Sequence, residues 1–414
     1  MKKNVKKVKK QIKQRNSHLH DSITHKDTNK QTKNDIALKD KERRHKLKEK
    51  PPQEEREHLF RKLRQDITNK IITEEKPSRK IDLSESYYLS RETLGEYVTL
   101  DWKHSEEIIR LTERLYDYVK DETRQRPYNV MMLAEPGSGK SHFVKCLAKY
   151  FGPRVEGVIF NMTAMRDLDD LTQPIDMARN LTVKRIIPLL FLDEFDSDTK
   201  NCSILLPLLW DGELNVGHRE LRTGKVIIIL SGSGVSIQEA MKASKGMQTK
   251  IAGGFAKLPD LFSRMNGGEI VVPRLDEVDL NNDRDRRTDK VCITIALLRN
   301  RFGDNLDEIC WPLLSFVARS KFRYEARSIA HLVDCIQTNA VKAGRLHADN
   351  LGLPFHDVTI LKAHSLAYHI IAEDGPAAVV DLWLKLKKYD KPVTFEHKLS
   401  RPWHARDESS VKES

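Results

Sequence analysis

Cysteine is scarce in this 414-residue sequence, and no long hydrophobic run is present. The five cysteines lie far apart, without the close pairs of a zinc site or a redox motif, which favours reduced thiols in a cytoplasmic protein. The longest apolar runs, such as Ile186–Leu192, are much shorter than the roughly 18 residues that cross a bilayer. The Lys-rich start is followed by no apolar segment, so we expect neither a membrane protein nor a secreted one.

Positive charge is unevenly distributed along the chain. Overall, 72 Lys and Arg residues against 60 Asp and Glu residues give a formal net charge of +12. Residues 1–60 hold 19 of the basic and 9 of the acidic side chains, so residues 61–414 have 53 and 51 and are close to neutral. A basic tail of this kind could bind the phosphates of DNA or RNA without sequence preference, or it could simply be solvated.

The first 57 residues are rich in Lys, Asn, Gln, Asp and Thr and contain only isolated Val, Ile and Leu. This composition buries too little apolar surface to offset the entropy lost on ordering, so we expect a disordered or transiently helical tail. From Glu54 to about Thr73, an amphipathic stretch predicts a helix or an interaction segment. A polar linker is expected to follow, up to about Ser86.

Helical patterns alternate with short apolar runs in the next part of the chain. Five runs have the length of buried strands: Val130–Leu133, Val158–Phe160, Ile187–Leu192, Val226–Leu230 and Ile270–Val272. Helical periodicity begins at Ser105 and returns at Ser141–Tyr150. This alternation indicates an α/β domain with a parallel sheet covered on both faces. Beyond Leu275 we expect only helices, near 288–301, 306–319, 325–342 and 359–388.

The strongest motif is the segment AEPGSGKS, residues 134–141, between the first predicted strand and the next helix. It nearly fits the phosphate-loop pattern G-x-x-x-x-G-K-S/T, with Ala134 in place of the first glycine. Glycines let successive backbone amides face an anion, and the helix N-terminus adds the positive end of its dipole. Lys140 would reach the β- and γ-phosphates of ATP, and the Ser141 hydroxyl would bind Mg²⁺. The expected nucleotide-binding residues are Glu135, Pro136, Gly137, Ser138, Gly139, Lys140, Ser141 and His142.

A pair of acidic residues follows another predicted strand. Asp193 and Glu194 come directly after the run Ile187–Leu192. In open α/β sheets, ligands bind at the carboxyl ends of the strands. Asp193 would therefore hold Mg²⁺ through its water shell. Glu194 would polarise the attacking water, as a general base or an orienting group.

With these motifs, about residues 90–342 resemble the AAA+ family of P-loop ATPases. The resemblance covers the phosphate loop and the segment Asp193–Asp196, which is similar to that family's second nucleotide motif. It implies an α/β P-loop core with a parallel sheet between helices and an all-helical lid after it, and the composition adds a disordered basic N-terminal tail before it. The expected parts are a tail and linker (1–85), a nucleotide-binding α/β domain (86–275), a helical lid (276–345) and a helical C-terminal extension with a frayed end (346–414).

Other positions are similar to residues that act in catalysis in that family. After Val226–Leu230, either Ser231 or Ser233 would be the sensor-1 residue that contacts the γ-phosphate or the water. The family usually has Asn or Thr there, and the sequence does not choose between the two serines. Asn161 is similar to a position that can turn the catalytic glutamate on and off, although an ordinary strand-end asparagine is an equal alternative.

Two arginines extend the resemblance. Arg264, in the segment Pro259–Met265, is similar to the arginine finger, whose guanidinium stabilises charge on the transferred phosphoryl group. In this family the finger comes from the neighbouring subunit, which implies a ring or helical oligomer of the chain with itself, commonly a hexamer. Arg327, at the start of a predicted helix, is similar to the sensor-2 arginine of the lid.

Two segments bear on what such an ATPase would act upon. Leu208–Lys225 resembles the hairpin inserted before sensor 1 in Clp-type and helicase-type members. Its basic residues could contact a nucleic-acid backbone, but Glu213 and Glu220 dilute their charge, which favours a solvated hairpin. Met162–Asn180 lacks the aromatic-apolar-Gly pore loop by which Clp-type unfoldases grip polypeptide, which disfavours a standard unfoldase.

The sequence therefore predicts a Mg²⁺-dependent AAA+ ATPase that couples ATP binding and hydrolysis in an oligomer to remodelling or loading of a nucleic-acid or protein client. The alternative is a nucleotide-controlled switch or scaffold that regulates a partner effector with little turnover. Residues 1–57 are a candidate contact for DNA or RNA, and no membrane partner is expected. Residues 343–414 contain no motif that identifies a client.

Overall fold

The computed structural model describes residues 52–77, 79–198, 200–216, 219–232, 258–279, 284–303 and 306–395. Most of the predicted basic tail, the candidate Ser233 and the frayed end after Lys398 lie outside these ranges. Nearly all of the described residues belong to one compact unit, Arg56–Lys398. Among the described helices, none is long and apolar enough to cross a membrane.

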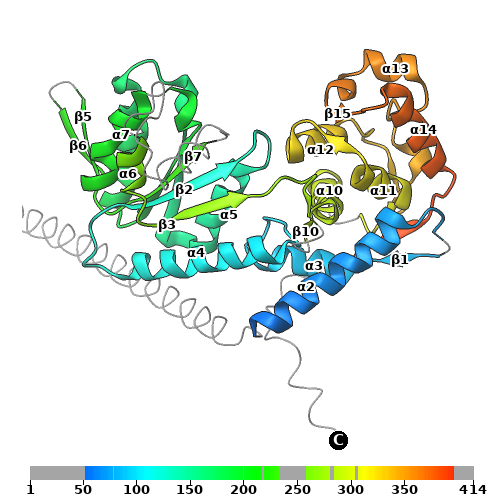
Figure 1. The fold of residues 1–414 in the computed structure, drawn as a ribbon, viewed down its shortest axis with the longest axis horizontal. Coiled ribbons are helices and arrows are strands. Elements are labelled where there is room, and N and C mark those ends of the chain that lie inside the picture. The colour runs from blue at the N-terminus through cyan, green and yellow to red at the C-terminus, as the bar shows by residue number, and fades with distance from the viewer. Residues whose placement is uncertain are drawn as a thin grey trace, which may run out of the picture. The chain divides into compact units, whose positions relative to one another are not determined.

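A parallel sheet forms the centre of the α/β region (Figure 1). Its strands are β2 (Tyr128–Ala134), β3 (Val155–Asn161), β4 (Ile187–Asp193), β7 (Ile227–Gly232) and β8 (Glu269–Val272). The order across the sheet is β3-β4-β7-β2-β8, and every neighbouring pair is parallel. β2 is buried along its whole length, because parallel strands of this kind are covered on both faces. The five predicted strands are confirmed.

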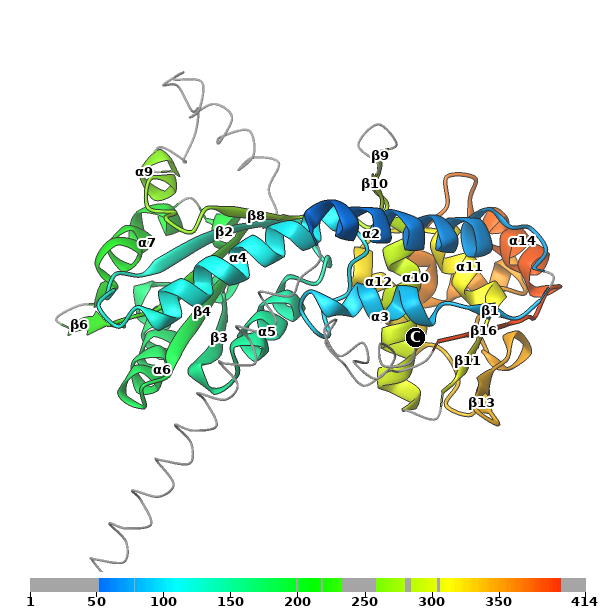
Figure 2. The ribbon, with the colours of Figure 1, turned by 90° about the horizontal axis from the view of Figure 1, so that it is seen from below.

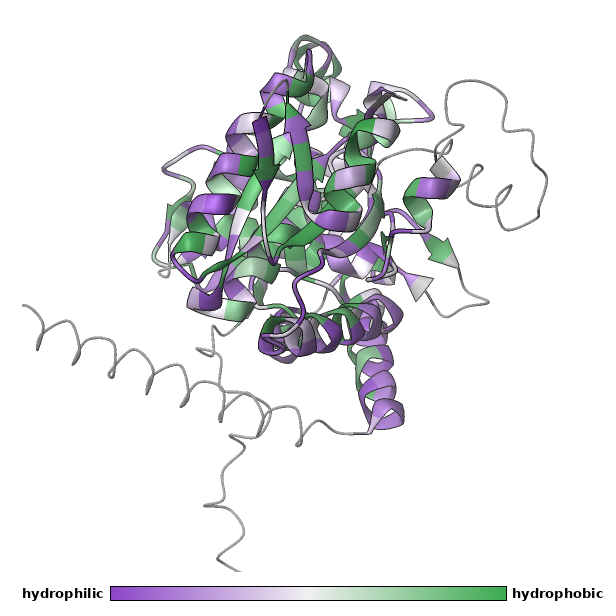
Figure 3. Ribbon diagram, turned by 90° about the vertical axis from the view of Figure 1, so that its left-hand side faces the viewer, coloured by the Kyte–Doolittle hydropathy of each residue, from purple (hydrophilic) through white to green (hydrophobic). Residues whose placement is uncertain are grey.

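Two layers of helices cover the sheet (Figures 2 and 3). α4 (Trp102–Lys120) and α5 (Lys140–Phe151) pack on one face, and α6 (Thr172–Val183) and α7 (Lys200–Asp211) pack on the other. Successive residues of β2 alternate between these layers: Val130 belongs to the core under α4, and Met131 to the core under α7. The predicted α/β core, with its parallel sheet between helices, is confirmed.

Helices dominate the chain after the sheet. They are α10 (Arg287–Phe302), α11 (Trp311–Arg319), α12 (Glu325–Asp334), α13 (Val358–Ala363) and α14 (Pro376–Lys387). The first agrees with its predicted bounds, whereas the others are shorter than expected. Pro312 and Pro376 stand in the first turns of α11 and α14, where the missing N–H of proline costs nothing.

The expectation that strands end at Leu275 is wrong. A second, small sheet has the order β1-β16-β11-β14-β13. Its strands are β1 (Ile81–Asp82), β16 (Pro392–Thr394), β11 (Glu308–Cys310), β14 (Arg345–Leu346) and β13 (Val341–Lys342). Strands of two or three residues are too short to produce an alternating pattern, so sequence periodicity could not find them.

The segment that the sequence groups with the tail belongs in part to the helical region. α2 (Gln53–Ile67) is the predicted amphipathic helix, and it continues into a π-helical turn (Thr68–Thr73). The indole Nε1 of Trp311 donates to the backbone oxygen of Lys70 at 2.9 Å. The expected linker contains β1, which pairs with β16, and α3 (Ser84–Glu92). These contacts show that this part of the chain packs against the helical region and is not a linker.

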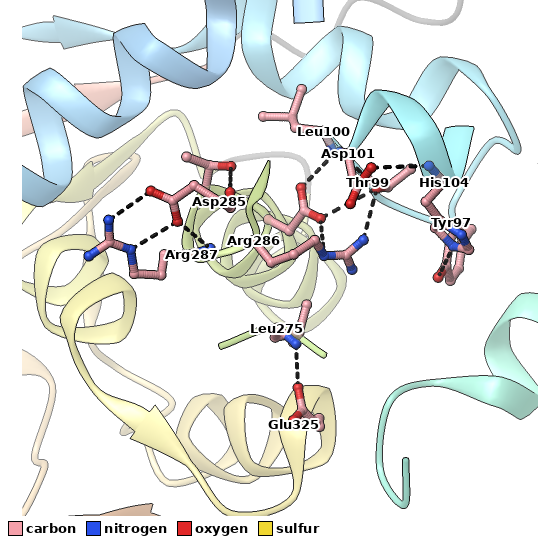
Figure 4. Close-up of polar contacts among 12 residues, drawn as sticks. Tyr97, Thr99, Leu100, Asp101, His104, Leu275, Asp285, Arg286, Arg287 and Glu325 are labelled. Atoms are coloured by element: carbon pink, nitrogen blue, oxygen red, sulfur yellow. Dashed lines mark hydrogen bonds and ion pairs between the residues drawn. The ribbon is translucent and has the colours of Figure 1, made fainter. Parts of the chain in front are cut away.

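A buried ion pair joins α10 to the segment before α4 (Figure 4). Arg286 Nε lies 2.8 Å from Asp289 Oδ2, and both side chains are buried. The carboxylate also accepts a hydrogen bond from the backbone N of Leu100 at 2.5 Å, and Arg286 Nη1 donates to Thr99 Oγ1 at 3.3 Å. Burial raises the pKa of Asp289 to about 6, while the Arg286 charge opposes that rise. The ionised carboxylate therefore depends on these partners.

Replacing Asp289 by Asn should destabilise the fold. The change removes the carboxylate that lies 2.8 Å from the buried Arg286 Nε, and breaking a buried ion pair costs about 3–5 kcal/mol of unfolding free energy. Urea unfolding of the full chain measures this loss. Glu373→Gln is the control, because it breaks an exposed pair with Lys321 and should have little effect. A loss for Asp289→Asn no larger than that of the control would contradict the importance of the buried pair.

Candidate functional site

The phosphate loop connects β2 to α5 through two glycines in the left-handed region. Gly137 has a φ of 84° and Gly139 a φ of 91°, which other residues adopt only with strain. Gly139 precedes the first residue of α5, and its carbonyl accepts the hydrogen bond from Phe143 N at 2.9 Å. Ala134 is the last residue of β2, where it pairs with Val272 in extended backbone. The departure from glycine at that position therefore introduces no strain.

Three polar atoms near this loop are buried without a hydrogen-bond partner among the described residues. They are Lys140 Nζ, Ser138 Oγ and Ser231 Oγ. The Lys140 side chain is 7% exposed, and its ammonium lies 3.3 Å from Asp193 Oδ1. That approach is an ion pair without the alignment of a hydrogen bond. Because burial of a polar group is costly unless it is paired, this arrangement fits a polar ligand that offers several acceptor oxygens.

Strand register brings the predicted acidic and polar residues to one edge of the sheet. Asn161 pairs with Asp193 across β3 and β4, and Asp193 pairs with Ser231 across β4 and β7. These residues end their strands at or near the carboxyl side. Lys140, the first residue of α5, reaches the same edge through its contact with Asp193. An ammonium, a carboxylate and a hydroxyl thus meet at one edge.

Glu194 stands in an unusual backbone conformation immediately after β4. Its φ and ψ are 55° and 41°, a left-handed conformation that is strained for a residue with a side chain. The side-chain Nδ2 of Asn161 donates to Glu194 Oε2 at 3.3 Å. Asn161 Oδ1 in turn accepts from Thr163 N at 2.9 Å, which fixes the orientation of the amide. Backbone strain of this kind is concentrated at functional sites.

The start of α12 packs directly on the phosphate loop. Arg327 N donates to the carbonyl oxygen of Gly137 at 3.2 Å. A Cβ atom on Gly137 would lie 2.3 Å from the carbonyl oxygen of Tyr324. The Arg327 side chain itself is exposed. The backbone of Arg327 therefore lies beside the loop, and its role as sensor 2 stays a prediction.

A buried glutamate fixes the first turn of α12 to the segment after β8. Glu325 Oε2 accepts a hydrogen bond from Leu275 N at 2.6 Å (Figure 4). Glu325 Oε1 lies 3.5 Å from Arg274 Nε. Burial raises the pKa of Glu325, which this backbone hydrogen bond opposes. The sequence analysis missed this residue and Tyr324, because no local pattern marks contacts between segments so far apart in the chain.

His142, the last of the expected nucleotide-binding residues, faces the segment before α4. Its ring Nε2 lies 3.2 Å from the carbonyl oxygen of Glu96, and its ring centre is 6.5 Å from that of Tyr97. Glu96 also contacts Lys149 of α5 at 2.5 Å. Both the first and the last turn of α5 therefore contact the segment before α4.

Arg264 lies apart from the loop of its own chain. Its carbonyl oxygen accepts from Asn129 Nδ2 at 2.8 Å. Asn129 is near the start of β2 and Ala134 at its end, roughly 17 Å away along the strand. The guanidinium Cζ of Arg264 lies 6.0 Å from the centre of the Trp210 ring, which is 45% exposed. Within one chain, Arg264 and Lys140 are not brought together.

The segment before β7 contains the expected hairpin. β5 (Glu213–Val216) and β6 (Arg219–Arg222) pair in antiparallel register. Arg222 contacts Glu213 at 3.0 Å and Glu220 at 2.6 Å. Lys225 Nζ donates to the carbonyl oxygen of Asp121 at 2.6 Å. The two cations are thus engaged by their own chain, in agreement with a solvated hairpin.

No family model and no curated protein matches the sequence. NtrX from Brucella abortus in complex with ATP is a solved structure with 18% identity and a TM-score of 0.38, covering 55% of this chain and 50% of that one. Its complex with ADP has 16% identity and a TM-score of 0.39, covering 61% and 56%. The S. cerevisiae Hsp104–ADP complex has 15% identity and a TM-score of 0.40, covering 60% and 45%. The chain spans about half the length of these structures.

Gly137→Ala should weaken the fold more than Gly139→Ala. Both glycines have positive φ, so either alanine adds about 1–2 kcal/mol of backbone strain. Only at Gly137 does the new methyl group also meet the backbone of Tyr324, whereas nothing lies within 4 Å at Gly139. We expect a further loss of about 1–3 kcal/mol for Gly137→Ala, measured by urea unfolding. Equal losses for the two variants would show that α12 does not pack on the loop.

Proposed function

We propose that this protein, with its AAA+-type phosphate-loop fold, is an ATP hydrolase that binds ATP with Mg²⁺ and acts as an oligomer. One observation carries the proposal: Lys140, Ser138 and Ser231 present buried polar atoms, without a hydrogen-bond partner among the described residues, around the edge where Asp193 and Glu194 lie. A triphosphate offers many acceptor oxygens and a high negative charge, so it satisfies these groups better than a neutral or apolar ligand.

The phosphate loop and Asp193 would hold the nucleotide and its metal. Backbone amides of the loop and the Lys140 ammonium bind the β- and γ-phosphates, at the N-terminus of α5. Ser141 supplies a hydroxyl and Asp193 a carboxylate, the oxygen ligands that Mg²⁺ prefers. When bound, Mg²⁺ neutralises charge on the phosphates. Lys140 lies 3.3 Å from Asp193, so phosphate and metal ligands share one site.

Glu194 would take up the proton of the attacking water. Its strained backbone directs the carboxylate from the end of β4, and the Asn161 amide contacts one of its oxygens at 3.3 Å. Asn161 therefore acts on the orientation of the base. Ser231 would contact the γ-phosphate or the water from the neighbouring strand, because it pairs with Asp193 in the sheet.

The two arginines would respond to the γ-phosphate from different subunits. Arg327 belongs to the chain that holds the nucleotide, since its backbone contacts Gly137. Arg264 is held at the opposite end of β2 and would act on the nucleotide of a neighbouring copy. Loss of the γ-phosphate would release both contacts and allow the helical lid to move. This division requires a ring or helical oligomer, for which a hexamer is the commonest form in the family.

The proposed client is a protein or a nucleic acid. ATP turnover would drive remodelling or loading of a protein or nucleic acid. In the alternative function, the nucleotide would set a switch or scaffold for a partner effector, with little turnover. The Arg222 and Lys225 contacts within the hairpin region leave residues 1–57 as the main candidate for binding DNA or RNA. An ATPase assay with and without DNA or RNA, repeated without residues 1–57, separates these functions.

Lys140→Ala and Glu194→Gln should fail at different steps. Lys140→Ala removes the phosphate-binding ammonium and should abolish ATP binding. Glu194→Gln keeps the binding groups and loses the base, so it should retain ATP while turnover falls by about 10²-fold or more. Filter binding of labelled ATP and release of phosphate measure the two steps. Normal turnover by Glu194→Gln would refute the catalytic assignment.

Arg264→Ala should leave ATP binding unchanged and lower kcat by about 10³-fold or more, as loss of an arginine finger does. Arg126→Ala is the matched control, because its guanidinium lies 4.6 Å from the centre of the same Trp210 ring. We expect the control to keep its turnover. If Arg126→Ala stops hydrolysis and Arg264→Ala does not, the finger has been assigned to the wrong arginine.

A further inference from the structure

One buried amide at the start of β2 contacts two distant segments. Asn129 is completely buried, and its Nδ2 donates to the carbonyl oxygens of Leu209 at 2.7 Å and Arg264 at 2.8 Å. Its backbone N donates to Asn266 Oδ1 at 2.8 Å, and its backbone oxygen accepts from Gly267 N at 2.7 Å. A single residue thus makes four hydrogen bonds to the end of α7 and to the loop before β8.

The two carbonyl acceptors lie next to the contact between Arg264 and Trp210. Leu209 immediately precedes Trp210, whose exposed ring lies under the guanidinium of Arg264 and that of Arg126. The other acceptor is the backbone of Arg264 itself. Asn129 therefore fixes both the arginine and the aromatic ring on which its side chain rests. An aromatic face attracts a guanidinium, so the ring limits where the side chain can point.

An asparagine is otherwise unfavourable at this position. The other residues of β2 are mostly apolar, as expected for a strand that is buried on both faces. Asn129 Oδ1 has no hydrogen-bond partner among the described residues, which is costly for a buried oxygen. A primary amide offers two N–H donors on one uncharged nitrogen, so it can bind two carbonyl oxygens at once. This double donation accounts for the choice of residue.

We propose that Asn129 is a positioning residue for Arg264, which it holds in the geometry needed to act on the nucleotide of a neighbouring copy. The inference rests on the proposed ATPase function. β2 ends in the phosphate loop at Ala134, so the loop of one site and the arginine for the next site are attached to opposite ends of one strand. Asn129 touches no nucleotide and acts only through Arg264.

Asn129→Asp tests this role with little change in size. The substitution replaces the donor nitrogen by an oxygen that faces two carbonyl oxygens, so the loop should shift. Because a misplacement of about 1 Å can cost about 10²-fold in rate, we expect kcat to fall by about that factor. The Kd for ATP should stay within about twofold, since the variant keeps the binding groups of its own loop.

Mixed oligomers provide the decisive measurement. Glu194→Gln subunits have a normal Arg264 but no base, so in excess they supply well-held arginines to the sites of Asn129→Asp subunits. Turnover per Asn129→Asp subunit should then recover. Arg264→Ala mixed in the same way is the positive control. If Asn129→Asp instead damages its own phosphate loop through β2, mixing restores nothing and the proposal is overturned.

Asn266→Asp is the matched control for a change in the same loop. It keeps the oxygen that accepts from Asn129 N, and it replaces the nitrogen that donates to Pro127 O at 2.9 Å by an oxygen. Its turnover should fall far less than that of Asn129→Asp, because the Asn266 side chain donates to neither the Leu209 nor the Arg264 carbonyl. Asn129→Ala, which adds no charge, replaces Asn129→Asp if the latter does not fold. Failure of both to fold, while Asn266→Asp folds, would contradict the proposal, because the amide would then support the core.

The same assays distinguish a failure of the proposed ATPase function from a failure of the role of Asn129. A wild-type chain without ATP hydrolysis would overturn the proposed function and this inference together. An active wild-type chain with a defective Arg264→Ala variant and a normal Asn129→Asp variant would overturn only the role of Asn129. The expected result is a kcat about 10²-fold lower for Asn129→Asp and about 10³-fold lower for Arg264→Ala, with recovery in both mixtures.

Discussion

The buried ammonium of Lys140 is the group on which the rest of the site depends. Its side chain is 7% exposed, and Asp193, 3.3 Å away, is its only ion-pair partner among the described residues. The hydroxyls of Ser138 and Ser231 are buried beside the same edge without partners. Several unsatisfied polar groups in one place oppose folding unless a ligand pairs them. A site for such a ligand would explain three other features at this edge. They are the loop glycines, the acidic end of β4 and the strained backbone of Glu194.

The strand β2 connects the phosphate loop to two other parts of the chain. At the carboxyl end of β2, the loop touches α12 through Gly137 and Tyr324, and Glu325 ties that helix to Leu275 after β8. At the start of β2, Asn129 holds the loop that contains Arg264. A change at the loop can therefore reach α12 directly and the segment that contains Arg264 through one buried strand. The Gly137 contact is with the backbone of Tyr324, and the buried side chains of Glu325 and Asn129 each bond to a backbone group.

Much of this was predictable from the sequence, for a physical reason. The inner strands β2, β4 and β7 are apolar runs buried on both faces, and the phosphate loop needs glycines at fixed positions, so each leaves a local signature. β1 and β16 have only two and three residues and leave none. The contact of Gly137 with Tyr324 and the amide of Asn129 depend on tertiary packing. Local patterns do not encode which carbonyl a buried Asn will meet.

Thermal unfolding of the full chain with Mg²⁺ and either ATP or AMP measures whether the buried polar groups bind a triphosphate. If phosphates satisfy Lys140, Ser138 and Ser231, ATP at 100 times its Kd should stabilise the fold by about 2.7 kcal/mol and raise the Tm. AMP, which lacks the β- and γ-phosphates, should raise it far less. Equal shifts with the two nucleotides, or no shift with ATP, would contradict the claim that these buried groups form a triphosphate site.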